Sequence, residues 1–131
     1  MVRAKNKSKD YLTPLEWEVM NVVWELGGRP SVREVIDKAY PNKEKAYTTI
    51  QTVMNNMEAK NFLKKKKIGL VNFYKPTVKR AKMLDGATKT FVKRVFKGSF
   101  LELANYLVNS NSLSDKEFAD LYKMIKDKSK K

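Results

Sequence analysis

Cysteine and histidine are both absent from this chain of 131 residues. Their absence excludes disulfides, thiolate zinc sites, cysteine nucleophiles and imidazole general bases. Glycine is scarce, with five residues and no G-x-G-x-x-G pattern, so a glycine-rich phosphate-binding loop is excluded as well. The sequence also lacks the glycine-flanked elbow of serine hydrolases, and the segment Ser112–Lys116 is better explained as the start of a helix. The sequence therefore predicts that the protein is not an enzyme, and it implies no cofactor and no metal.

Long apolar runs are missing too. No stretch approaches the roughly 18 residues that a membrane-spanning helix needs. The first residues are basic and small polar ones without an apolar segment, which is unlike a signal peptide. We therefore expect a cytoplasmic protein in which residues 1–10 form a flexible basic arm.

What the chain has in excess is positive charge. Lysine and arginine number 28 against 14 acidic residues, which gives a formal net charge of +14. A small domain needs a net charge of only about 2–8 for solubility. An excess of this size favours a polyanionic partner, namely DNA, RNA or an anionic membrane.

Two helix starts are marked by capping boxes, Thr13 with Glu16 and Ser31 with Glu34. A third helical pattern lies within residues 42–61, because its apolar residues are spaced 3, 3, 1 and 3 apart, which is helical and not strand-like. The pattern then changes to two short strand-like segments, Phe62–Lys64 and Val71–Lys75, around a basic tip that contains Gly69. Three helices followed by a β-hairpin on a basic chain predict a winged helix-turn-helix over residues 11–78.

Residues 81–128 read as three further amphipathic helices, the last of which begins with a capping box at Ser114 and Glu117. Three helices cannot easily bury all of their apolar stripes on themselves, and exposed stripes of this size mark an interface. We therefore expect a homodimer held by this extension. The predicted fold class is mainly α with a small β-hairpin: a winged helix-turn-helix plus a C-terminal helical dimerisation segment.

The third helix carries polar, uncharged residues that are poor helix formers. In a winged helix this element enters the major groove, where Gln and Asn can bind adenine and Thr can contact thymine. The sequence thus nominates five residues to read bases: Thr48, Thr49, Gln51, Thr52 and Asn55.

Basic residues around the same helix and on the hairpin suit phosphate neutralisation, which carries no sequence preference. The candidates for DNA-backbone contacts are Lys45, Lys60, Lys64, Lys65, Lys66 and Lys67.

Other partners were weighed against duplex DNA. A winged-helix module that binds another protein, with incidental charge, stays open as the alternative. A membrane is disfavoured because the basic residues do not gather opposite an apolar face on one helix. RNA is disfavoured because Phe73 and Tyr74 are adjacent and would point to opposite faces of a strand, which leaves no stacking platform.

The segments L-T-P-L-E-W-E-V-M-N-V-V-W-E-L-G and A-Y-T-T-I-Q-T-V-M-N-N-M resemble the penicillinase repressor (BlaI/MecI) family of bacterial transcription factors. The similarity extends over about residues 11–126. It implies a homodimer that represses transcription from a pseudo-palindromic operator. Family members often carry Lys or Arg at the positions of Thr48 and Gln51, so the DNA sequence bound, or its affinity, is expected to differ here.

The resemblance also bears on regulation. In some family members a β-lactam-sensing membrane protein triggers cleavage of an Asn–Phe bond in the C-terminal region. Asn105 and Tyr106 lie near that position here, and a gap-free comparison places the bond at Tyr106–Leu107. Residues 105–107 are therefore the candidate cleavage region, and a membrane sensor protease is the implied partner. Another branch of the family senses copper through cysteines, which this chain lacks.

Overall fold

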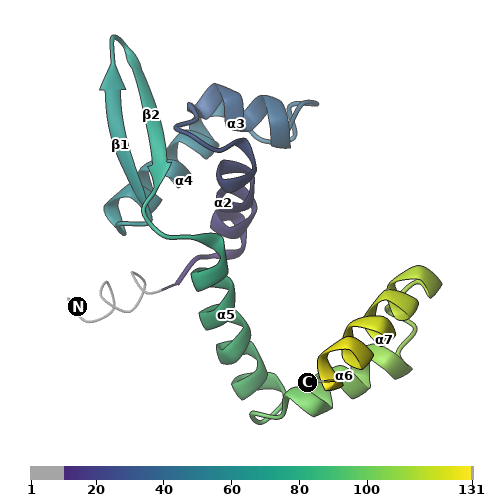
Figure 1. Ribbon diagram of the computed structural model, residues 1–131. Helices are drawn as coiled ribbons and strands as arrows, with labels where there is room; N and C mark the ends of the chain where they lie inside the picture. The colour runs from purple at the N-terminus through teal and green to yellow at the C-terminus, as the bar shows by residue number, and fades with distance from the viewer. Residues whose placement is uncertain (1–10, 131) are drawn as a thin grey trace. The chain divides into compact units, whose positions relative to one another are not determined.

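The computed structural model describes residues 11–130, so the predicted basic arm lies outside the described residues. Within these residues the elements, which Figure 1 labels, are three helices, a hairpin and three more helices in chain order. They are α2 (Pro14–Leu26), α3 (Val32–Ala39), α4 (Tyr47–Ala59), β1 (Leu63–Ile68), β2 (Val71–Pro76), α5 (Arg80–Val95), α6 (Phe100–Asn109) and α7 (Asp115–Ser129). The predicted fold class, a mainly α winged helix with further C-terminal helices, is confirmed.

The predicted capping boxes are present. In α2 the Glu16 backbone N–H donates to the Thr13 hydroxyl, and Glu16 Oε1 accepts from the Thr13 backbone N–H at 2.8 Å. Ser31 and Glu34 make the same reciprocal pair at the start of α3. Each box satisfies backbone donors that a helix start would otherwise leave unpaired.

The third helix is shorter at its N-terminal end than the sequence pattern indicated. It begins at Tyr47, and its N-cap residue Ala46 offers no side-chain hydrogen bond. Residues 41–45 form turns instead, in which Lys43 has a φ of 62° and the Asn42 N–H donates to Glu44. A residue with left-handed backbone angles interrupts a regular α-helix, so Lys43 prevents α4 from extending toward residue 42.

One apolar core joins α2, α3, α4 and the base of the hairpin. Its buried residues are Leu12, Val19, Met20, Val23, Val32, Val35, Ile36, Tyr40, Ile50, Met54, Met57, Phe62, Leu63 and Tyr74. Trp17 and Trp24 pack at its edge, with ring centroids 6.1 Å apart. Full burial of one such side chain contributes about 1.5–3 kcal/mol, so this core is what fixes the third helix and the hairpin relative to each other.

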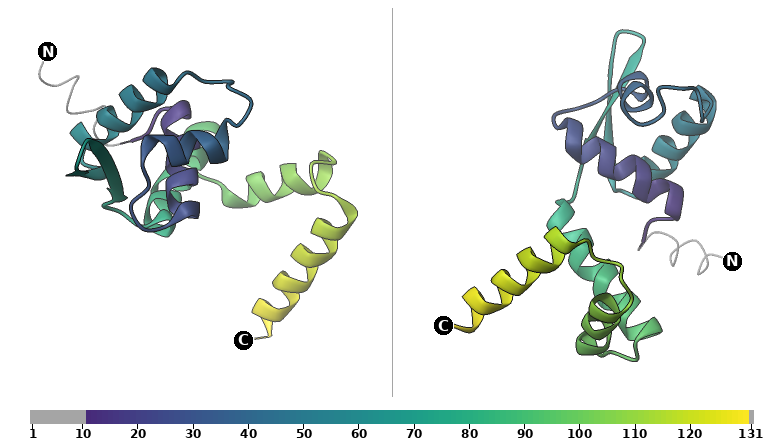
Figure 2. Two further views of the ribbon diagram at one scale, coloured as in Figure 1. Left: turned by 90° about the horizontal axis from the view of Figure 1, so that it is seen from above. Right: turned by 90° about the vertical axis from the view of Figure 1, so that its right-hand side faces the viewer.

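The hairpin corrects one sequence prediction. Lys64–Lys67 were expected at its tip, but they lie within β1, and the connection to β2 is the two-residue turn Gly69–Leu70. The turn is short because Gly69 supplies a φ of 65° at the first central position, as a type II′ turn requires. The outer edge of β2 is also paired, since the Tyr74 N–H donates to the Pro30 carbonyl at 2.9 Å. Figure 2 shows the hairpin tip standing clear of α2, α3 and α4.

The chain divides into two compact units, residues up to Leu84 and residues from Asp85 onward. The entry into α5 is tied to α2, because Trp24 Nε1 donates to the carbonyl of Val78, just before α5, at 3.0 Å and Arg80 Nε donates to Asn21 at 3.2 Å.

Among the residues of the second unit that the structure describes, Val92 is the one fully buried large apolar residue, and α6 and α7 contain no buried residue. No helix within residues 11–130 combines the length and apolar character needed to cross a membrane.

Candidate nucleic-acid interface

Helix α4 has two chemically different sides. Ile50, Met54 and Met57 are completely buried in the core. Thr48 and Thr52 are exposed and lie four residues apart, so they share the opposite side of the helix. Thr49 is exposed beside them, and Gln51 is half-buried at the margin. Four of the five predicted base-reading residues therefore line or flank one accessible polar surface, which we call the α4 polar face.

Asn56 belongs to this surface although the sequence reading did not nominate it. It is exposed and continues the spacing of four from Thr52. The sequence did contain a signal for Asn56, because residues 48, 52 and 56 are spaced by four and therefore lie on one side of a helix. Its amide could donate to and accept from a base edge as readily as the predicted residues.

Asn55 occupies a different position, at the junction of α4 and the hairpin. Its Oδ1 accepts a hydrogen bond of 2.7 Å from the Tyr74 hydroxyl, and the Lys65 ammonium lies at 3.5 Å from the same oxygen. Burial raises the pKa of Tyr74 above its ordinary value, with smaller contributions from Tyr47 and Glu58. The phenol therefore stays protonated at neutral pH and holds the Asn55 side chain toward the hairpin.

Lys60, predicted to contact the DNA backbone, has an acidic partner within the fold. Its ammonium forms an ion pair of 2.8 Å with Glu16 Oε1, the oxygen that also accepts from the Thr13 N–H. The side chain of Lys60 is 16% exposed and that of Glu16 5%. An ammonium held this way joins the end of α4 to the start of α2, so Lys60 has an internal partner in place of a phosphate.

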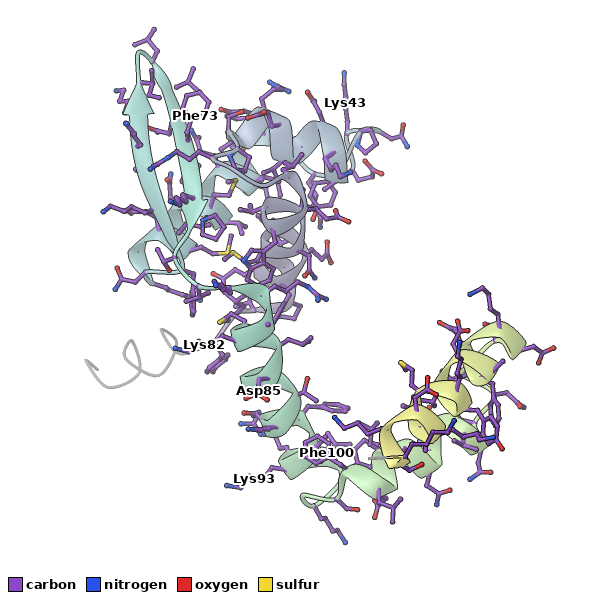
Figure 3. The ribbon with its side chains drawn as sticks, viewed as in Figure 1. Lys43, Phe73, Lys82, Asp85, Lys93 and Phe100 are labelled. Atoms are coloured by element: carbon purple, nitrogen blue, oxygen red, sulfur yellow. The ribbon has the colours of Figure 1, made fainter. Side chains whose placement is uncertain are left out.

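The lysines of β1 are exposed and alternate between the two faces of the hairpin. Lys65 is paired in register with the buried Tyr74, so Lys65 and Lys67 lie on the face that carries Tyr74. Lys64 and Lys66 lie on the other face, opposite Lys75 and Phe73. Phe73, labelled in Figure 3, is bridged to Ser31 at the start of α3.

Two more cationic side chains lie near the start of α4. Lys45 is exposed one residue before the N-cap position. Arg33, which the sequence reading did not single out, lies over the Tyr47 ring with its guanidinium carbon 5.1 Å from the ring centroid. The uncapped start of α4 leaves backbone N–H groups without a side-chain acceptor, and such a helix start favours an anion. Lys45 and Arg33 add positive charge at the same end.

A polar helix face beside a lysine-bearing hairpin, on a winged-helix core, defines a DNA-binding protein. The chain belongs to the penicillinase repressor family, whose sequence pattern matches residues 12–127. Members of this family are DNA-binding transcriptional regulators, so the predicted family and the prediction that the chain is not an enzyme are both confirmed.

Several similar proteins span nearly the same length. The methicillin resistance regulatory protein MecI of Staphylococcus aureus (strain N315) is 27% identical over 117 residues, covering 89% of this chain and 94% of that protein. The penicillinase repressor of S. aureus is 29% identical over 118 residues, covering 88% and 91%. That of Bacillus licheniformis is 24% identical over 116 residues, covering 88% and 90%.

Proposed function

We propose that this protein represses transcription by binding a pseudo-palindromic DNA operator as a homodimer in the cytoplasm. Residues 11–78 are the DNA-binding domain in this proposal, and residues 81–128 the dimerisation region. The observation that carries it is the α4 polar face, which is exposed on one side while the other side is locked into the core. A rigidly held helix with accessible amides and hydroxyls can place them against base edges in the major groove.

The base contacts are assigned to Thr48, Thr49, Gln51 and Thr52, with Asn56 added and Asn55 placed at the margin. Phosphate contacts are assigned to Lys45 and to the β1 lysines, Lys64, Lys65, Lys66 and Lys67. Lys60 is left out because Glu16 neutralises it within the fold. This division separates residues that read sequence from residues that supply affinity.

Dimerisation is supported by the apolar residues that the second unit exposes. They include Phe100, Leu101, Tyr106, Val108, Phe118, Tyr122, Met124 and Ile125, each at least 44% exposed. Sedimentation at micromolar concentration should give about twice the 15.2 kDa of one chain. Truncation after Lys79 should give a monomer with weaker operator binding, and an unchanged association state would contradict the assignment.

Selection of bound fragments from a random DNA library tests the function directly. We expect a palindrome whose half-sites lie about one helical turn apart, because a two-fold dimer presents two α4 helices. A mobility-shift titration should show affinity that falls steeply with salt. If no duplex is selected while another protein is captured stoichiometrically, the chain is a protein-binding winged helix instead.

Inactivation by proteolysis is proposed at residues 105–107. Asn105 and Tyr106 are exposed on α6 and Leu107 is half-buried. All three lie within α6, so a protease must first unwind this part of the helix, where the Asn109 side-chain amide also donates to the Asn105 carbonyl at 3.0 Å. Immunoblots of cells exposed to the inducer of a membrane sensor protease should show an N-terminal fragment ending in this region. Persistence of the full-length chain during derepression would exclude this route.

A further inference from the structure

The turn of the hairpin is apolar and highly exposed. Leu70 is 94% exposed, more than any other large apolar residue among those the structure describes. Its neighbours Ile68 and Val71 are 56% and 46% exposed. Gly69 and Leu70 alone form the connection, so the leucine projects at the end of a narrow two-stranded ribbon. Leu70 belongs neither to the apolar core nor to the α4 polar face, so neither explains why the turn carries an apolar residue.

The charge on the ribbon is distributed over both of its faces. Lys64 and Lys66 lie on one face, and Lys65 and Lys67 on the other. A ribbon lying flat on one DNA strand would need lysines on one face alone. A ribbon whose tip enters a groove has a phosphate backbone on each side, and lysines on both faces neutralise both backbones.

We infer that Leu70 is an apolar wedge that the hairpin inserts into the minor groove beside the base pairs contacted by α4. The minor groove is about 6 Å wide, so the turn enters it and the lysine side chains reach the phosphates at its rims. Apolar wedges partly unstack base steps and bend the duplex toward the major groove. Leu70 would thus select flexible steps such as TA or CA/TG, at positions that α4 does not contact.

The inference rests on the proposed function, because the groove must belong to the duplex that α4 binds. The contact between Lys65 and Asn55 places the hairpin directly beside α4. Both elements are fixed by one core, which includes Leu63 and Tyr74 of the hairpin. When α4 lies in the major groove, the neighbouring hairpin is therefore positioned to reach the adjacent minor groove of the same duplex.

The test uses the full chain and the DNA fragment that the wild-type protein selects from a random library. Leu70→Ala removes the wedge, Leu70→Met keeps apolar volume, and Leu26→Ala is the control at a leucine 38% exposed on α2. Affinity is measured by fluorescence anisotropy over a range of salt, and bending by energy transfer between the fragment ends. Thermal unfolding of each variant checks the fold.

We expect Leu70→Ala to weaken binding by about tenfold, with less bending and an unchanged salt slope, because apolar contact is lost and charge is not. Leu70→Met should stay within about twofold of wild type. Removing either lysine pair, Lys64 with Lys66 or Lys65 with Lys67, should flatten the plot of log K against log salt by about 2 units.

Two results would overturn the wedge and leave the repressor function standing. In the first, Leu70→Ala binds and bends the operator as the wild-type protein does. In the second, only one of the two lysine pairs changes the salt slope when it is removed. Binding to anionic lipid vesicles that requires Leu70, together with DNA binding that does not, would assign the tip to a membrane and also overturn it. If the wild-type protein selects no DNA, the proposed function and the wedge fall together.

Discussion

The two units of the chain place their apolar side chains in opposite environments. Within residues 11–130 the first unit encloses fourteen buried apolar residues in one cluster, and the second buries Val92 alone among its large apolar residues. Within the second unit Phe96 contacts Phe91 and Tyr106, with ring centroids 5.8 and 6.4 Å apart, yet Phe91 and Tyr106 stay about half exposed. The first unit therefore has an apolar core of its own, whereas the second keeps most of its large apolar side chains accessible.

Removing apolar side chains of α7 should affect both association and operator binding strongly. Phe118 and Ile125 are seven residues apart, so they share one side of the helix. In the double variant Phe118→Ala/Ile125→Ala the dimer should dissociate. Operator affinity should fall about 100-fold or more, because two linked half-site contacts become independent. Sedimentation and anisotropy titration measure the two effects.

The matched control is Lys123→Ala, an exposed residue on the same helix. It should leave the association state and the affinity unchanged. If the Phe118/Ile125 variant stays dimeric, the exposed side of α7 is not the dimer interface, and the contrast between the two units loses its functional meaning.

The ion pairs of the two units should differ as their cores do. Glu16→Ala leaves the enclosed Lys60 ammonium unpaired and removes the acceptor of the Thr13 N–H. The free energy of unfolding of the first unit should fall by about 3 kcal/mol. The pair Lys116–Asp120 on α7 is 85% and 61% exposed, so Asp120→Ala should change stability by about 0.5 kcal/mol at most. Urea unfolding followed by far-ultraviolet circular dichroism reports the helices of both units, and tryptophan fluorescence reports the first unit alone, since Trp17 and Trp24 both lie there.

A double variant refines this comparison. Replacing Glu16 and Lys60 together by methionine removes both charges and keeps apolar volume, so much of the lost stability should return. If Glu16→Ala lowers the free energy of unfolding no more than Asp120→Ala does, the ion pair between Glu16 and Lys60 does not stabilise the packing of α2 against α4.

The third prediction concerns the α4 polar face. Gln51→Ala and Thr52→Ala should each weaken operator binding by about 1–3 kcal/mol and relax the sequence preference at the contacted bases. Stability should hardly change, because Thr52 is exposed and Gln51 is half-exposed. Competition between the selected operator and single-base variants gives the measurement. Thr90→Ala, an exposed threonine of α5, serves as the control. If both α4 variants bind the operator unchanged, α4 is not the reading helix.

Much of the fold was predictable because its signals are local. The capping residues Thr13 and Ser31 mark helix starts within four residues, and the spacing of Ile50, Met54 and Met57 predicts the buried side of α4. The lysines of β1 were misplaced because four identical side chains hide the alternation by which a half-buried strand is recognised.

Helical spacing in the sequence predicts which side of α4 is exposed, but not which polar residues of the candidate site are held by partners elsewhere in the fold. Asn55 and Asn56 are adjacent and chemically identical, yet one is held by Tyr74 and the other is exposed. Lys60 resembles any surface lysine at a helix end, and its partner Glu16 is 44 residues away. Contacts at such sequence separation depend on how the helices pack, which no local pattern records.

Tyr74 links α4 to the hairpin within the first unit, and removing its hydroxyl should change stability and binding less than the variants above. Tyr74→Phe removes the 2.7 Å hydrogen bond to Asn55 and keeps the buried ring. The free energy of unfolding should fall by about 1 kcal/mol. The affinity for the operator should fall slightly more than the affinity for unrelated duplex DNA. The reason is that the freed Asn55 no longer fixes the hairpin beside α4.

Alkaline pH gives an independent readout of the same phenol. Because the pKa of Tyr74 is raised in the folded state, its contribution to stability is complete below the ordinary tyrosine pKa of 10.0 and declines as pH rises above it. Tyr74→Phe should therefore make the loss of stability above pH 10 less steep. Tyr40 contributes in the same direction, because burial and its 2.8 Å hydrogen bond to Glu18 raise its pKa to about 12. Tyr40→Phe should make the loss of stability at alkaline pH less steep and leave operator specificity unchanged. Tyr74→Phe should change both the alkaline loss of stability and the operator specificity. Equal effects of the two variants on specificity would show that the Tyr74–Asn55 bond does not position the hairpin.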